Sequence, residues 1–240
     1  MTDVRMSFLQ HIAEFRQRLL VCAVAVTLTG AVGYYFSLKL LKILTIPAGK
    51  TQLVYLSPLE PFMVKFKIAV FSGIVMSLPL LLYEILMFVA PALKDREKKL
   101  IMPSIFFLVI LFLSGAVFGF YYIMPAGTQW LLNQAGGVIK ANISASMYVT
   151  YAGWFLMGMG VSFETPLFIL LMVRLGVITP EQLAKSWRYA VLMILLLAAI
   201  LTPDWNPVTM IVMAIPMLIF YVGSIPLSRL IRPKPKTLED

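Results

Sequence analysis

The sequence predicts an all-α integral membrane protein with six transmembrane helices. Of its 240 residues, 60% are hydrophobic and only 13% are charged, whereas an ordinary soluble domain carries about 25% charged residues. The apolar residues also gather in six runs, and a run of about 20 apolar residues is enough for a helix to cross a bilayer. Composition and pattern therefore place the chain among membrane proteins.

The six runs follow one another along the chain, and spans five and six are short. We expect spans at about 19–36, 68–90, 100–124, 149–173, 189–201 and 208–226. The fifth would reach roughly 20 Å at about 1.5 Å per residue, against a hydrocarbon core of about 30 Å. Two interpretations of this pair remain: helices that span a locally thinned bilayer, which the flanking charges favour, or a re-entrant hairpin.

Lysine and arginine set the orientation. With the N-terminus in the cytoplasm, the inner segments hold 14 of the 20 basic residues and the outer segments hold 6. Basic residues gather in cytoplasmic loops, so both termini are expected there. The lysines of the first outer loop are typical of an interfacial segment.

Two short motifs predict helix starts. In "SPLEPF", Ser57 is expected as the N-cap, with Pro58 at the first helical position and Glu60 three residues on. In "TPEQL", Thr179, Pro180 and Gln182 repeat the pattern and open a cytoplasmic extension of helix five.

Prolines within the spans, at positions 79, 103, 166 and 216, favour kinked helices. We expect a curved, glove-like bundle forming one membrane domain over residues 1–230, and a short basic cytoplasmic tail over 231–240.

The composition excludes several kinds of site. Cys22 and His11 are the only residues of their types, which leaves no disulfide within the chain and no zinc site of His and Cys ligands. We expect no metal and no cofactor. The net charge of +9 fits the membrane charge rule rather than nucleic-acid binding.

Two acids lie on the cytoplasmic side. In "FLQHIAEFRQRLL", apolar residues at helical spacing predict an amphipathic helix on the membrane surface, with Glu14 and Arg18 paired one turn apart. In "APALKDREKKL", Glu97 stands among basic residues. Each is typical of a solvated surface charge, but together the two acids could bracket a cationic ligand through bidentate contacts to guanidinium groups.

Two more acids, Glu164 and Glu84, lie within spans four and two. An acid in hydrocarbon is costly and usually functional. We expect no basic partner for them in any span, so Glu164 should be protonated and able to donate a hydrogen bond. The acceptor is either a hydroxyl of the same chain or, as we favour, a polar group of another helix.

The ordered motifs resemble those of the TatC family, the multispanning subunit of the twin-arginine protein translocase. "HIAEFRQRLL" is similar to the family's H-L-x-E-L-R-x-R-L, and "SPLEPF" to its P-x-E-x-F. "LPLLLYEILMFVAPALKDREKK", "GAVFGFYYIMP" and "GVSFETP" resemble its later motifs. The similarity runs from Phe8 to about Pro226.

The resemblance implies a receptor that recognises paired arginines in the signal peptides of folded precursors. It also implies transport across the prokaryotic inner membrane driven by the proton-motive force, self-association, and single-span partners of the TatA and TatB types. Signal-peptide binding would fall on Glu14, Glu97, Arg16, Lys94 and Phe88. Partner docking would fall on Glu164, Phe163, Pro166 and Met210. The periplasmic loops and their structural positions would include Pro47, Pro58, Glu60, Phe62, Asp204 and Asn206.

The chain departs from the family pattern at two places. After helix five the family has T-P-P-D-x-x-x-Q where this chain has "TPDWNPVTM", so either Asp204 or Asn206 takes the acidic position and Met210 replaces the glutamine. In helix six, Val222 replaces the acid of the family's L-Y-E.

The sequence is less consistent with two other functions. A small-molecule or ion transporter would use Glu164 and Glu84 as proton sites, but the chain lacks the inverted repeats typical of transporters. An intramembrane enzyme would need paired acids or a nucleophile and base in the spans, which the sequence does not offer.

Overall fold

The computed structural model describes residues 8–49, 53–90, 98–133, 142–174, 176–202 and 207–231. The chain forms two compact units. The first comprises residues 1–43 and 57–109, and the second comprises residues 44–56 and 110–240. That the chain works as one membrane domain over residues 1–230 stays a prediction.

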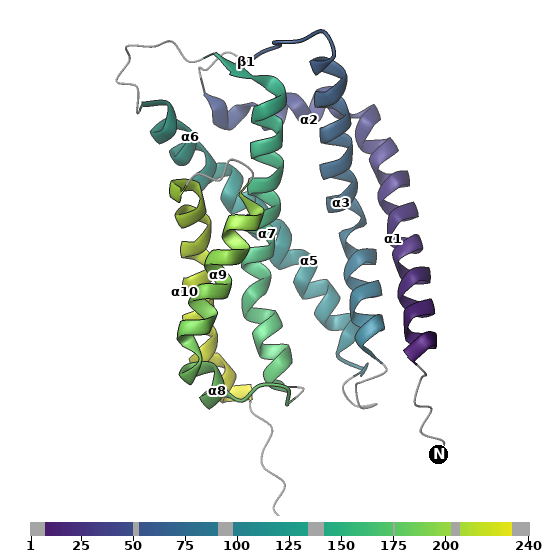
Figure 1. Ribbon diagram of the computed structural model, residues 1–240, viewed down its shortest axis with the longest axis vertical. Helices are drawn as coiled ribbons and strands as arrows, with labels where there is room; N and C mark the ends of the chain where they lie inside the picture. The colour runs from purple at the N-terminus through teal and green to yellow at the C-terminus, as the bar shows by residue number, and fades with distance from the viewer. Residues whose placement is uncertain are drawn as a thin grey trace, which may run out of the picture. The chain divides into compact units, whose positions relative to one another are not determined.

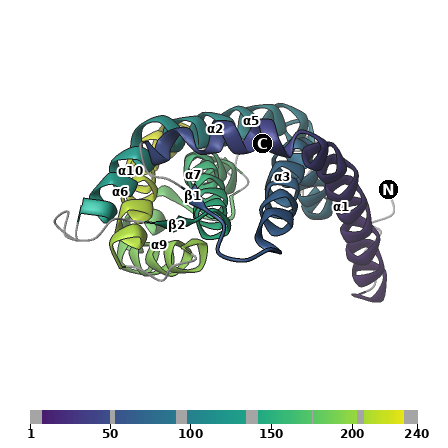
Figure 2. The same cartoon turned by 90° about the horizontal axis from the view of Figure 1, so that it is seen from above.

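The first unit is built on α1 (Phe8–Tyr35) and α3 (Glu60–Val89), which lie side by side in both views (Figures 1 and 2). Gly30 of α1 faces Gly73 of α3, so the two backbones approach closely. At the same place, the Thr29 hydroxyl donates a hydrogen bond of 2.8 Å to the Gly73 carbonyl oxygen. Small residues and interhelical hydrogen bonds are the usual means by which membrane helices associate.

The N-terminal part of α1 differs from the expected surface helix. The segment around Glu14 continues without a break into the first span, so α1 is one helix of 28 residues. The physical reason is local, because neither glycine nor proline interrupts the sequence between Phe8 and Thr29. A short helix, α2 (Ser37–Leu44), then follows α1 and carries Lys39 and Lys42 of the expected interfacial segment.

The predicted start of the second span was wrong in detail. Helix α3 begins at Glu60, its N-cap residue is Leu59, and no side chain caps it. Ser57 lies in the preceding turn, where its hydroxyl oxygen accepts a hydrogen bond from the Leu59 N–H. The turn takes up Ser57 and Pro58, so the helix starts later than the motif suggested.

The second unit is organised around α7 (Ala145–Arg174), which packs against α10 (Pro207–Ile231) and α9 (Trp187–Leu201). Met124, Phe155, Met159 and Met213 are almost inaccessible and form the centre of its core. Helix α5 (Ile101–Phe118) starts in the first unit and ends in the second.

One π-helical turn, η3 (Gly119–Ile123), joins α5 to α6 (Met124–Asn133). Its wide turn is closed by the Met124 N–H, which donates to the Gly119 carbonyl oxygen five residues back. The next residue, Pro125, has no N–H to continue the α-helical pattern, which favours such a local adjustment. Apolar periodicity does not indicate this turn.

The second unit also contains two short strands that were not predicted. β1 (Leu53–Val54) pairs in parallel with β2 (Ile143–Ser144). Before β1, the one-turn helix η1 (Ile46–Ala48) buries Pro47 and Ala48. The Tyr148 hydroxyl of α7 donates a 2.9 Å hydrogen bond to the Leu44 carbonyl oxygen. These contacts attach residues 44–49 and 53–54 to α7 and to the strand that precedes it.

Within the described residues, five helices are long and apolar enough to cross a membrane, and α9, with 15 residues, is the shorter sixth. The capping box of Thr179 and Gln182 is confirmed, and it opens a separate short helix, α8 (Pro180–Lys185), ahead of α9. The sixth helix is longer than expected, since α10 has 25 residues and continues past Pro226. Membrane helices accommodate proline, which therefore did not mark the end of this span.

Candidate functional site

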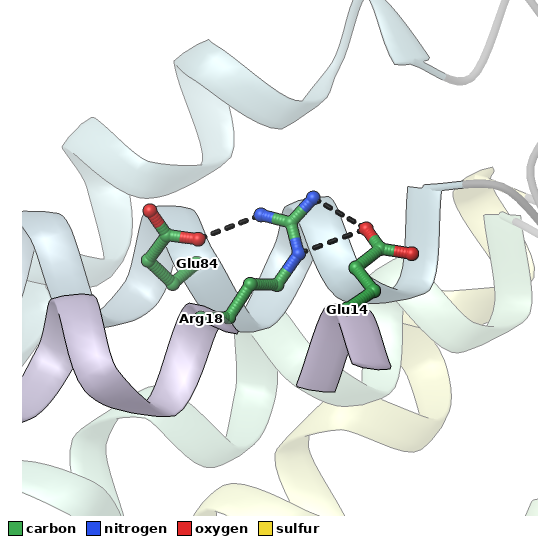
Figure 3. A network of polar contacts seen from close by, with 3 residues as sticks. All are labelled: Glu14, Arg18 and Glu84. Carbon is green, nitrogen blue, oxygen red and sulfur yellow. Dashed lines mark hydrogen bonds and ion pairs between the residues drawn. The ribbon is translucent and has the colours of Figure 1, made fainter. Parts of the chain in front are cut away.

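The most prominent polar site lies in the first unit, where α1 and α3 bring two carboxylates to one guanidinium (Figure 3). Arg18 donates to Oε1 of Glu14 from Nε at 2.9 Å and from Nη2 at 2.6 Å. Its third nitrogen, Nη1, donates to Oε2 of Glu84 at 2.6 Å. Glu14 and Arg18 are one turn apart on α1, and Glu84 comes from α3. Arg18 thus bridges the two helices.

The cluster of Glu14, Arg18 and Glu84 is partly shielded from its surroundings. The side chains of Arg18, Glu14 and Glu84 are 22%, 20% and 12% exposed. The second carboxylate oxygen of Glu14, Oε2, is buried and has no hydrogen-bond partner among the residues that the structure describes. Figure 3 shows this oxygen turned away from Arg18. With both acids ionised, one guanidinium balances only one of them, and the cluster keeps one net negative charge.

The ion pair between Arg18 and Glu84 corrects the expectation that the intramembrane acids lack a basic partner. The expectation failed because the first span was taken to begin at residue 19, which left Arg18 outside it. In the continuous helix α1, Arg18 reaches Glu84 across 66 positions of sequence. Sequence could have indicated this contact only if the relative register of α1 and α3 had been known.

Aromatic rings lie beside the acidic cluster. The rings of His11 and Phe88 stack with their centroids 4.2 Å apart, and Phe15 packs against the same Phe88 ring at 5.5 Å. Phe88 of α3, an expected site residue, is therefore held against the first turns of α1, the helix that carries Glu14. Arg16 is exposed. The other two expected residues, Lys94 and Glu97, lie outside the described residues.

A third acid, Glu164, lies in the second unit on α7. Its side chain is 5% exposed, and its Oε1 atom has no hydrogen-bond partner within the described parts of the chain. The rest of the chain therefore buries this acid. Burial among protein atoms removes a carboxyl group from hydrocarbon, where it is most costly.

The residues around Glu164 are fixed by aromatic packing. Phe163 contacts the rings of Phe220 and Phe118 at centroid distances of 4.7 and 5.6 Å. A Cβ at Gly160 would overlap the Phe112 ring, which explains why this position of the motif holds glycine. Two further expected residues, Pro166 and Met210, are half-buried.

The residues expected in the outer loops separate into three groups. Pro47 and Glu60 are buried, and Pro58 and Phe62 are exposed. Asp204 and Asn206 fall outside the described residues, so the choice between them as the acidic position is not tested. Among the described residues, no group of three or more His, Cys, Asp or Glu side chains could hold a metal ion.

Long apolar helices with polar clusters between them define a multi-pass α-helical membrane protein. The family model of the Sec-independent protein translocase protein TatC matches residues 10–216. The chain belongs to this family, which confirms the predicted resemblance, and is a component of the twin-arginine protein translocase rather than an enzyme.

Individual relatives support the same family assignment. The TatC protein of Carboxydothermus hydrogenoformans is 35% identical over 236 residues, which cover 98% of this chain and 97% of the relative. The TatC protein of Helicobacter pylori strain J99 is 36% identical over 230 residues, which cover 96% of this chain and 92% of the relative. A crystal structure described as the twin arginine translocase receptor TatC superposes with a TM-score of 0.82 at 30% identity, covering 92% of this chain and 99% of that one. The all-helical, six-span fold is therefore confirmed.

Proposed function

We propose that this chain is the receptor subunit that recognises the paired arginines of twin-arginine signal peptides. The similar solved structures are described as twin arginine translocase receptors. The proposal depends on the surroundings of the Glu14 carboxylate. One of its oxygens is held by Arg18, and the other is buried without a partner among the described residues.

The chemistry of this carboxylate suits a guanidinium. A guanidinium offers planar, fixed N–H groups, remains charged, and tolerates partial burial better than an ammonium group does. The unpartnered Oε2 of Glu14 can accept such a donor, and the net negative charge of the cluster attracts it. Glu97 would hold the second arginine of the motif. Phe88, Arg16 and Lys94 would line the approach of the peptide.

We infer that Glu164 on α7 has a separate role, which is to dock partner subunits. Glu164 has an unpartnered carboxyl oxygen in the described structure, and it lies beside the packed ring of Phe163. A single-span partner of the TatA or TatB type could donate a polar hydrogen to that oxygen, provided that its helix displaces the cover over Glu164. Pro166 and Met210 would form the rest of this surface.

The proposed setting is the inner membrane of a prokaryote, with both termini in the cytoplasm. The distribution of lysine and arginine supports it, since 14 of the 20 basic residues fall on the inner side. In that orientation, Glu14 and Glu97 meet precursors on the cytoplasmic side. Transport driven by the proton-motive force and self-association within the translocase belong to the same proposal.

A binding experiment tests the receptor role. Purified full-length protein is titrated with a labelled Arg-Arg signal peptide and with the same peptide carrying Lys-Lys. We expect Glu14→Gln and Glu97→Gln each to weaken Arg-Arg binding at least tenfold, because each removes one charged hydrogen-bond acceptor. Glu181→Gln makes the same chemical change at an exposed position of α8 and should bind as the parent protein does. Unchanged affinity in Glu14→Gln would reject the proposal.

A further inference from the structure

Glu84 has no place in the function proposed above, although it contributes to the same cluster. Its side chain is 12% exposed, and it accepts a 2.6 Å hydrogen bond from Arg18. A carboxylate within a membrane-spanning helix is costly, and such a residue is usually functional. The contact of Glu84 with Arg18 therefore calls for an explanation in terms of that arginine.

The guanidinium of Arg18 is divided between two acids. Nε and Nη2 donate to a single oxygen of Glu14, and Nη1 donates to Glu84. An arginine facing one carboxylate prefers to engage both of its oxygens in parallel. Here Glu84 holds the third nitrogen, and Arg18 contacts only Oε1 of Glu14 (Figure 3).

This division leaves Glu14 able to receive a ligand. If Glu84 carried no charge, Arg18 could turn to pair fully with Glu14. Both Glu14 oxygens would then be used, and the net negative charge of the cluster would be lost. A guanidinium from a peptide would have to displace an internal one of the same chemistry. The charge of Glu84 thus opposes self-occupation of the site.

We propose that Glu84 is a positioning residue of the arginine-binding site: it holds the Arg18 guanidinium back from Glu14, so that one Glu14 oxygen and one negative charge stay available for an arginine of the ligand. The proposal rests on the function proposed above, in that Glu14 receives that arginine. It also assigns Arg18 a definite role, which is that of an internal competitor for Glu14.

A charge-removal cycle on the full-length protein tests this role. The probe is the labelled Arg-Arg peptide, and the variants are Glu84→Gln, Arg18→Gln/Glu84→Gln and Glu14→Gln. We expect Glu84→Gln to weaken binding about tenfold, the scale of one charge-assisted hydrogen bond. Replacing Arg18 as well removes the internal competitor and should restore affinity, so the double variant should bind within about threefold of the parent protein. Glu181→Gln is the matched control.

The cycle separates positioning from structural support. A residue that only stabilises the α1–α3 pair would leave the double variant as weak as the single one or weaker, and that result would overturn the proposal, as would unchanged binding in Glu84→Gln. If the single variant does not fold, the double variant decides alone: affinity near that of the parent supports the proposal, and lost affinity refutes it. Parent-like binding in Glu14→Gln would instead reject the receptor function itself.

Discussion

Gly30 and Gly73 bring the backbones of α1 and α3 into direct contact: a Cβ on Gly73 would lie 2.9 Å from both the Cα and the N of Gly30. It would also lie 2.9 Å from the carbonyl oxygen of Val26. All of these atoms belong to backbone, so no side-chain rotation can relieve the overlap. The helices must separate if a side chain is introduced.

We therefore predict that Gly73→Ala destabilises the protein by about 1–3 kcal/mol, the usual cost of overpacking. The measurement is thermal unfolding of the purified protein in detergent. Gly223→Ala is the matched control, because a Cβ at Gly223 on α10 meets nothing within 4 Å. In that helix, alanine should be neutral or stabilising by up to about 1 kcal/mol. Equal effects at the two positions would contradict the close approach.

Tyr148→Phe should lower the free energy of unfolding by about 1 kcal/mol. The substitution deletes the hydroxyl that donates to the Leu44 carbonyl oxygen and leaves that acceptor without this hydrogen bond. Tyr189→Phe makes the same change at a side chain that is 76% exposed, and it should have no effect. Denaturation of both variants in one detergent is the test, and a Tyr148 variant as stable as the parent would count against the bond.

Thr179→Ala should cost about 1 kcal/mol of local stability, because it removes the hydroxyl that caps α8. The loss should appear as faster hydrogen exchange of the backbone N–H groups of residues 181–185, with little change elsewhere. Thr27→Ala serves as the control, since Thr27 lies inside α1 and its hydroxyl bonds only within its own helix. Unaltered exchange in α8 would show that the capping box does not support that helix.

Glu164→Leu should separate stability from partner docking. A buried carboxyl oxygen without a partner is costly, so an apolar side chain should leave stability unchanged or raise it by about 1–3 kcal/mol. The same variant should lose co-purification with single-span partner subunits, whereas Glu164→Gln keeps a polar group and should retain part of it. A Glu164→Leu protein that is less stable yet binds its partners normally would contradict both expectations.

The sequence predicted most of the fold because its strongest signals are local. Five of the described helices are apolar and long enough to cross the hydrocarbon core, and the box of Thr179 and Gln182 lies within four residues. Ser57 shows the limit of such reasoning. The residues that predicted a helix N-cap there form a turn instead, and α3 begins only at Glu60. The π-turn before Pro125 is a local adjustment that apolar periodicity does not report.

The candidate site could be predicted only in part for a related reason. Glu14 and Arg18 are one turn apart, so their pairing follows from helical geometry. The contact of Arg18 with Glu84 depends on the register between α1 and α3. Gly30 and Gly73 lie at the contact between these helices, but nothing in the sequence pairs one with the other. The burial of Glu164 likewise depends on packing between distant helices.

The attachment of Leu44 to Tyr148 bears on how the protein is made. The two residues are 104 positions apart, and residues 44–56 belong to the second unit although they precede most of the first. At roughly 5–20 residues per second, a ribosome needs about 5–20 s to synthesise the intervening chain. Throughout that interval, Leu44 has been synthesised whereas Tyr148, the residue that holds it, has not. The second unit therefore closes late in biogenesis, around a segment inserted early.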